Sequence, residues 1–149
     1  VIGKYGENTE RLRQVQALAS IKGYHAILLK DYEDIQELSL PEKALLFGLL
    51  SCFVICDDTV ASGHNEELPI LANAGFVIAI LCPTTGCSSW MHAHFPTSFR
   101  NVRVFEYSSD ISARIQEAIL WAEQQAQQVT RDWNELYPWR QATFPRGTD

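Results

Sequence analysis

Two kinds of segment alternate along the chain: short runs of consecutive apolar residues, and longer stretches with an apolar residue at every third or fourth position. The short runs are bounded by glycine or acidic residues, which is typical of strands buried on both faces of a sheet. They predict strands at 24–29, 52–56, 76–82 and 102–107. A further strand is expected at Val1 and Ile2, together with residues that would precede them in a longer protein.

The longer stretches predict helices whose ends carry residues that start or stop a helix. Thr9 can cap the first helix, and Gly23 follows its end. Ser39 and Glu42 form a capping box for the second helix. Pro69 cannot follow a full helical turn, so the third helix is expected to begin shortly before it. The predicted helices cover 9–22, 39–50, 65–74 and, from a cap at Ser109 or Asp110, the residues up to Pro138.

Strands that alternate with helices at this spacing predict parallel crossovers, with helices on both faces of the sheet. We therefore predict an α/β fold, a flavodoxin-like three-layer sandwich with a mostly parallel sheet, over residues 1–125. The apolar stripe of the last helix is longer than such a sheet needs, and Trp133 lies on it. Residues 126–149 are predicted to be a helix extension and tail that lead to another domain or a partner.

The composition of the chain indicates which kinds of binding partner to expect. The net charge is -6 and the 12 Lys and Arg residues are scattered along the sequence, so no nucleic-acid binding is expected. No apolar run approaches the roughly 20 residues that cross a bilayer, and no basic segment precedes an apolar stretch at the N-terminus. We therefore expect no membrane contact and a cytoplasmic location.

The cysteines allow a disulfide, a metal or a thiol interpretation. They are Cys52, Cys56, Cys82 and Cys87. Reduced thiols agree best with a cytoplasmic protein in which some cysteines lie in buried strands. A metal site would combine Cys82 and Cys87 with His92 and His94, but this spacing lacks the Cys-x-x-Cys pair that is typical of zinc sites. No metal is expected.

Ligands of open parallel sheets bind beyond the carboxyl ends of the strands, so the loops at those ends hold the candidate site residues. The loop after 52–56 is the densest. The candidates there are Asp57, Asp58, Ser62 and Glu67; other loops of this edge add Gly3, Tyr5 and Trp90. The two aspartates either orient a ligand or cap a turn. His64 is close enough to act as an acid or base, but an exposed loop histidine is the favoured interpretation.

The run that begins at Asp57 resembles two related families. In TIR domains a strand is followed by a loop serine and, five residues later, by a glutamate and a leucine; Ser62, Glu67 and Leu68 have this spacing. In nucleoside 2-deoxyribosyltransferases a Ser-Gly pair precedes a catalytic glutamate on a helix by the same interval, as Ser62 and Gly63 precede Glu67. The chain departs from the TIR pattern in having His-Asn in place of a Trp-Cys pair, and in Pro69.

Both families cleave an N-glycosidic bond on a flavodoxin-like sheet, so the resemblance implies that Glu67 is the catalytic residue. It also implies that NAD is a substrate and that no cofactor is needed. Cleavage develops positive charge at the anomeric carbon, which an ionised carboxylate stabilises or traps. The dipole of the third helix is expected to favour the ionised form of Glu67. Asp57, Asp58 and Ser62 would contact the substrate, and Tyr5 or Trp90 would stack on a base.

Three hypotheses follow. The first is an NAD-cleaving TIR-like effector domain of a bacterial defence or signalling protein, such as an antiphage system, activated by self-association or by a neighbouring regulatory domain. The second is a nucleoside or nucleotide N-glycosidase or deoxyribosyltransferase, which the Ser62-Gly63 pair supports. The third is a non-enzymatic module for ligand sensing or assembly, which the long last helix and Pro69 support.

Overall fold

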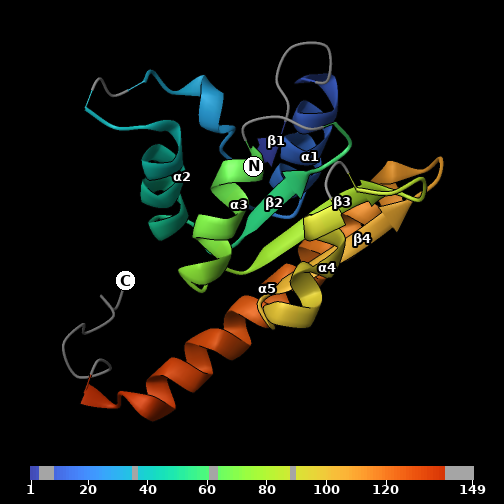
Figure 1. The fold of residues 1–149 in the computed structure, drawn as a ribbon. Coiled ribbons are helices and arrows are strands. Elements are labelled where there is room, and N and C mark those ends of the chain that lie inside the picture. The colour runs from blue at the N-terminus through green and yellow to red at the C-terminus, as the bar shows by residue number, and fades with distance from the viewer. Residues whose placement is uncertain (4–8, 35–36, 61–63, 88–89, 140–149) are drawn as a thin grey trace.

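A computed structural model describes residues 1–3, 9–34, 37–60, 64–87 and 90–139 (Figure 1). Within these residues the sheet has four strands, and each pairs with its neighbours in parallel. Their order in the sheet follows the chain: β1 (Ile2–Gly3), β2 (Val54–Asp57), β3 (Ile78–Pro83) and β4 (Val102–Tyr107). The helices are α1 (Thr9–Ile21), α2 (Leu40–Leu49), α3 (His64–Asn73), α4 (Trp90–Ser98) and α5 (Ile111–Leu136), with a 3-10 turn, η1 (Leu29–Asp31).

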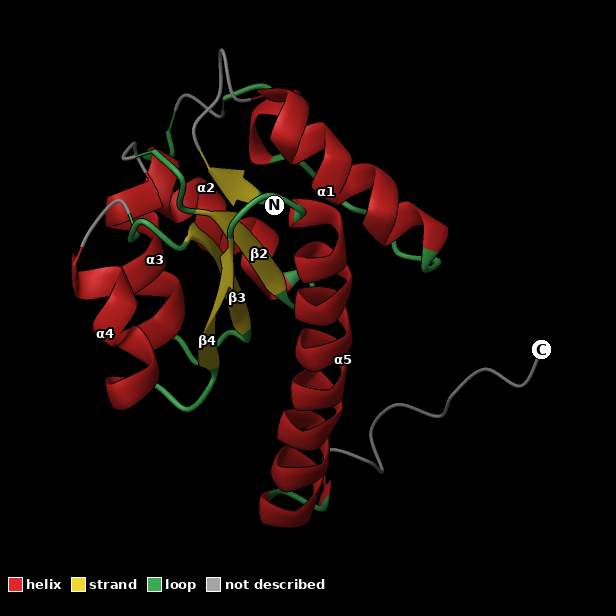
Figure 2. Cartoon of the chain, turned by 90° about the vertical axis from the view of Figure 1, so that its right-hand side faces the viewer, coloured by secondary structure: helices red, strands yellow, loops and turns green. Residues whose placement is uncertain are grey.

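Helices cover both faces of the sheet, which confirms the predicted three-layer α/β architecture. Successive side chains of a strand point to opposite faces. Val54 and Cys56 of β2 therefore pack with α2, α3 and α4, whereas Ile55 packs on the other face with α1 and α5. Figure 2 shows the two groups of helices on opposite sides of the strands.

The strands predicted for β2 and β3 are both present, but their bounds differ from the predicted ones. Each strand begins two residues later than predicted and extends one residue further, whereas β4 has its predicted bounds. Asp57, expected as the first loop residue, therefore ends β2 opposite Leu81 of β3. The backbone of Asp57 is thus held in place by its pairing with β3.

The predicted strand at 24–29 is wrong. Residues 24–28 form neither strand nor helix, and Leu29 begins η1. The segment still lies beside the first residue of the chain: the Val1 amine donates to the Ile27 carbonyl (2.6 Å), and Leu29 N donates to the Val1 carbonyl (3.4 Å). Since β1 has two residues, it offers too short an edge for a ladder.

The predicted start of α2 is confirmed, and that of α3 is one residue late. The capping box at α2 is complete: the Ser39 hydroxyl accepts from Glu42 N (3.4 Å), and the Glu42 carboxylate accepts from Ser39 N (2.8 Å). Glu67 lies in the first turn of α3, as predicted, but Pro69 lies inside the helix after a full turn, so the expectation that it could not follow one is wrong. Helix α4, in contrast, is an element that the hydrophobic pattern does not predict, because Pro96 lies inside it.

Helix α5 is continuous through the predicted boundary at residues 125 and 126. Asp110 caps its start through bonds from the backbone N–H groups of Ser112 and Ala113, and it ends two residues before Pro138, as predicted. The buried residues of α5 end at Ala122, and the rest of the helix extends past the sheet (Figure 2). A groove of about 720 Å³ lies between this extension and residues 51–53 and 74–77. None of the described helices combines the length and hydropathy needed to span a bilayer.

The prediction of four reduced thiols is wrong for one pair, because Cys82 and Cys87 form a disulfide. A turn closed by a bond from Gly86 N to the Pro83 carbonyl (2.9 Å) reverses the chain after β3 and brings the two Cα atoms to 5.1 Å. The pattern of apolar runs in the sequence does not predict such a turn. Cys52 and Cys56 are free thiols, the first exposed and the second buried.

We expect a thiol reagent to distinguish these cysteines. Burial, and then the nearby carboxylates of Asp58, Asp57 and Glu67, raise the pKa of the Cys56 thiol well above its ordinary value. A thiolate is the reactive form, so Cys56 should not react in the folded protein. Ellman's reagent should therefore titrate one thiol in the native protein, two in urea, and four after reduction in urea. Two fast thiols in the native protein would contradict this description of the β2 terminus.

Candidate functional site

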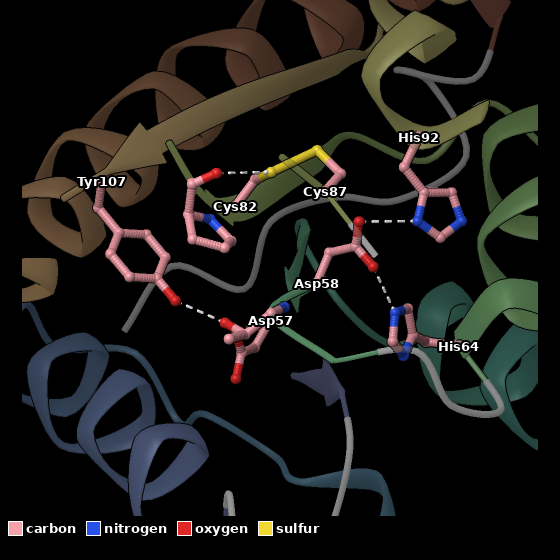
Figure 3. Close-up of a disulfide and its surroundings, with 9 residues drawn as sticks. Asp57, Asp58, His64, Cys82, Cys87, His92 and Tyr107 are labelled. Carbon is pink, nitrogen blue, oxygen red and sulfur yellow. Dashed lines mark hydrogen bonds and ion pairs between the residues drawn. A yellow bond between two sulfur atoms is a disulfide. The ribbon is translucent and has the colours of Figure 1, made fainter. Parts of the chain in front are cut away.

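Asp57 and Asp58 leave the carboxyl end of β2 in opposite directions. Asp58 N still donates to the Leu81 carbonyl (2.9 Å), so the extended backbone continues one residue beyond the strand. Because side chains alternate along extended backbone, Asp57 points towards α1 and Tyr107, whereas Asp58 points towards α3 and α4 (Figure 3). The adjacent aspartates therefore belong to two separate clusters.

The first cluster joins Asp58 to two histidines. His64 Nε2 lies 2.6 Å from Asp58 Oδ1, and His92 Nδ1 lies 2.9 Å from Asp58 Oδ2 (Figure 3). The exposed fractions are 0% for Asp58 and 1% for each histidine. His64 is the first residue of α3, and His92 lies in the first turn of α4. The cluster ties β2 and two helices together within the core.

The interpretation of His64 as an exposed loop histidine is wrong. The third helix begins at His64 rather than after it, and α3 packs on the sheet face to which Asp58 points. The imidazole is thereby buried. The metal-site interpretation of Cys82, Cys87, His92 and His94 is not supported either, because the cysteines pair with each other and His94 is exposed.

The second cluster surrounds Asp57 with polar groups from α1 and β4. The Thr59 hydroxyl donates to Asp57 Oδ1, and Thr59 N reaches the same oxygen at 3.3 Å. Arg11 Nε lies 3.5 Å from Asp57 Oδ2, and Arg11 Nη1 donates to the Tyr107 hydroxyl (3.0 Å). Asp57 thus closes a short turn, as one of the two sequence interpretations allowed, and holds α1 to the sheet.

Glu67 is a buried carboxylate at the same edge. Its exposed fraction is 4%, and it lies one helical turn after His64, so the two side chains share a face of α3. Burial raises the pKa of Glu67 above its ordinary value, and His64 offsets this only in part. The expectation that the helix dipole would favour the ionised form is therefore wrong in its net direction, because desolvation is the larger effect.

The candidate residues that the structure describes lie around the carboxyl end of β2, in separate clusters. Three carboxylates, those of Asp57, Asp58 and Glu67, each act electrostatically on the Cys56 thiol. Gly3 of β1 pairs in register with Asp57. Tyr5 and Ser62 lie outside the described residues, and Trp90 begins α4 with a side chain that also lies outside them.

Gly3 is a close-packing position. A Cβ at this residue would lie 3.0 Å from the carbonyl oxygen and 3.2 Å from the Cβ of Asp57, and 2.9 Å from Leu12 Cδ2. The Leu12 side chain can move away from such a Cβ, but the backbone of Asp57 is held by strand pairing. Gly3 therefore sets how closely β1 approaches the aspartate pair.

Gly3→Ala is expected to lower the free energy of unfolding by about 1–3 kcal/mol, as over-packing does in other cores. The reason is the contact with the Asp57 backbone, which forces β1 away from β2. Urea unfolding followed by circular dichroism measures the change. An unchanged midpoint would show that β1 has room that the structure does not allow.

Sequence reasoning did not assign a role to several residues of the two clusters. These are Arg11, Thr59 and Tyr107; His92 entered only the metal-site interpretation with the two cysteines. Thr59 is next to the aspartates and Tyr107 ends a predicted strand, so their positions could have suggested the edge of the sheet. Arg11 carried no such signal, because its place depends on how α1 packs.

The chain matches no family model, no curated protein and no solved structure.

Proposed function

We propose that the chain is a TIR-like domain that cleaves the N-glycosidic bond of NAD, with Glu67 as the carboxylate that acts on the ribose. One observation carries the proposal: Glu67 lies in the first turn of α3 at the carboxyl edge of a parallel sheet, and burial raises its pKa. Ligands of such sheets bind at this edge. Carboxylates with perturbed pKa values are concentrated at functional sites.

The direction of the pKa shift favours a functional role over a capping role. A glutamate that only stabilised the start of α3 would gain from the helix dipole and from solvent, and its pKa would fall. Glu67 has instead lost solvent, which leaves its ionised form poorly stabilised in the resting protein. An anomeric carbon that becomes positive in the transition state would provide the missing partner, so the interaction strengthens as the bond breaks.

NAD fits this carboxylate because its leaving group is a neutral nicotinamide, which departs without being protonated. The reaction then needs one ionised carboxylate and water, with the ribose hydroxyls held in place. Asp57 and Asp58 are both engaged within the protein, so they serve this scheme by fixing the edge of the sheet. Glu67 alone is assigned to the reacting carbon.

A second candidate is cleavage of a nucleoside or nucleotide, as in the deoxyribosyltransferases that the Ser62-Gly63 pair resembles. The raised pKa of Glu67 favours it, because a neutral base leaves more readily when an acid protonates it, and a raised pKa keeps a carboxylic acid protonated nearer to neutral pH. The same residue would then act as an acid.

The proposal includes activation by self-association, in a bacterial defence or signalling protein. Its support is the end of α5, where Trp133 and Leu136 are 47% and 70% exposed beyond the part of the helix that covers the sheet. Apolar side chains in such a position favour contact with a partner. Activity should therefore rise more steeply than in proportion to protein concentration.

Base release by the wild-type protein tests the proposal. The protein is incubated at low and high concentration with NAD, with purine and pyrimidine 2′-deoxynucleosides, and with the corresponding nucleotides; free bases are separated by chromatography. Nicotinamide release at high concentration is the expected result. Release from deoxynucleosides alone selects the second candidate. Intact substrates throughout would contradict both and leave a non-enzymatic sensing or assembly module.

A further inference from the structure

Three side chains of types that can bind a metal ion converge in the core at the end of β2. One donor atom each from Asp58, His64 and His92 lies within 4.8 Å of the other two, and all three residues are buried. They come from the residue after β2, from α3 and from α4, so the fold rather than a short motif brings them together (Figure 3). Two imidazole nitrogens and a carboxylate oxygen form a donor set used by zinc and by other divalent first-row transition metals.

His92 is the residue that hydrogen bonding does not explain. Its side chain is 1% exposed, and neither ring nitrogen has a hydrogen-bond partner among the residues that the structure describes. Nδ1 nevertheless lies 2.9 Å from Asp58 Oδ2. The two atoms are thus close but not aligned as donor and acceptor.

This close, misaligned approach is the geometry of two ligands that share a metal ion. In a hydrogen bond the N–H points at the oxygen, whereas in a metal site both lone pairs point at a third position between the ligands. A buried nitrogen without a partner destabilises the folded protein, and coordination removes that cost for Nδ1. Burial of the whole cluster excludes the solvent contact that would otherwise satisfy the ring.

We propose that Asp58, His64 and His92 bind one divalent first-row transition-metal ion, of which Zn²⁺ is the probe of choice. The ion would join β2 to the first turns of α3 and α4 and would fix the helix that carries Glu67. Its contribution is to the stability of the folded chain, since a metal that binds the folded state raises the apparent stability by mass action.

Metal binding by the wild-type chain is the primary test. Protein freed of metal by a chelator is dialysed against ZnCl₂, the bound zinc is measured by mass spectrometry, and Tm is recorded with and without the ion. We expect about one Zn²⁺ per chain and a higher Tm. A folded wild-type protein that binds no Zn²⁺ would overturn the proposal, whatever its action on NAD.

Cobalt distinguishes these ligands from the free thiols of Cys52 and Cys56. Co²⁺ bound by imidazole and carboxylate gives visible d–d absorption without the near-ultraviolet thiolate-to-cobalt bands that a cysteine site shows. We expect d–d bands alone. A thiolate band would place the ion at a cysteine and overturn the proposal.

Matched variants locate the site. His92→Gln keeps a polar side chain of similar size and removes the imidazole, and it should lower the affinity for Zn²⁺ at least tenfold. His94→Gln on the same helix is the control, because His94 is exposed, and it should bind as the wild type does. Undiminished binding by His92→Gln would show that the metal lies elsewhere.

Discussion

Asp58→Ala is expected to lower the free energy of unfolding by about 3–5 kcal/mol, which is the usual cost of removing one member of a buried charged group. The carboxylate lies within 2.9 Å of ring nitrogens of both His64 and His92, and all three side chains are buried. Without it, the buried imidazoles of His64 and His92 lose the carboxylate that lies between them, and polar groups in a core cost free energy when their interactions are removed. Urea unfolding in metal-free buffer measures the loss.

Asp31→Ala is the control for this prediction. Asp31 also forms an ion pair, with Arg13, but both side chains are exposed, so its removal should hardly move the unfolding midpoint. Asp58→Asn should fall between Asp58→Ala and the wild type, because the amide keeps the volume and one acceptor oxygen. An Asp58→Ala protein as stable as the Asp31→Ala protein would contradict the buried cluster.

The core of the fold was predictable because it depends on local patterns. The apolar runs of β2, β3 and β4 and the capping residues Ser39 and Asp110 each act over a few residues, and each correctly indicated its element. The segment at 24–29 has the same apolar character, but whether it forms a strand depends on how much of β1 is there to pair with it. The apolar pattern of residues 24–29 therefore cannot tell whether the segment pairs as a strand.

The site was predictable only where its residues share one stretch of sequence. Asp57, Asp58 and Glu67 lie at or after the end of the same strand, so the rule for parallel sheets placed them at one edge. His92 comes from a helix that contains Pro96, and its meeting with Asp58 depends on packing across the sheet face. Burial of Glu67 likewise arises from packing, and it reversed the pKa direction that the helix dipole alone suggested.

Glu67→Gln is expected to lower the rate of base release by about 10³-fold or more, while the fold is kept. Gln has nearly the same shape but cannot carry the negative charge that stabilises the anomeric carbon, and loss of one such interaction costs 10²–10³-fold or more in other enzymes. Glu66→Gln is the matched control, because the neighbouring carboxylate is exposed and points away from the core. Its rate should equal that of the wild type.

The raised pKa of Glu67 also predicts how the stability of the protein changes with pH. A carboxyl group whose pKa is higher in the folded state than in the unfolded state stabilises the protein at pH values below its unfolded-state pKa. This stability is lost as the pH rises through its folded-state pKa. Above the ordinary glutamate pKa, the burial of Glu67 therefore lowers the free energy of unfolding, so Glu67→Gln should have a higher Tm than the wild type at neutral pH. The difference should shrink as the pH is lowered towards the ordinary glutamate pKa. A lower Tm at neutral pH would indicate a structural role instead.

The decisive measurement is nicotinamide release from NAD. It is followed over time at high protein concentration for the wild type, Glu67→Gln and Glu66→Gln. We expect steady release by the wild type and by Glu66→Gln, and release at the background rate by Glu67→Gln. Equal release by all three proteins, or none by the folded wild type, would contradict the role of Glu67 in cleaving this bond.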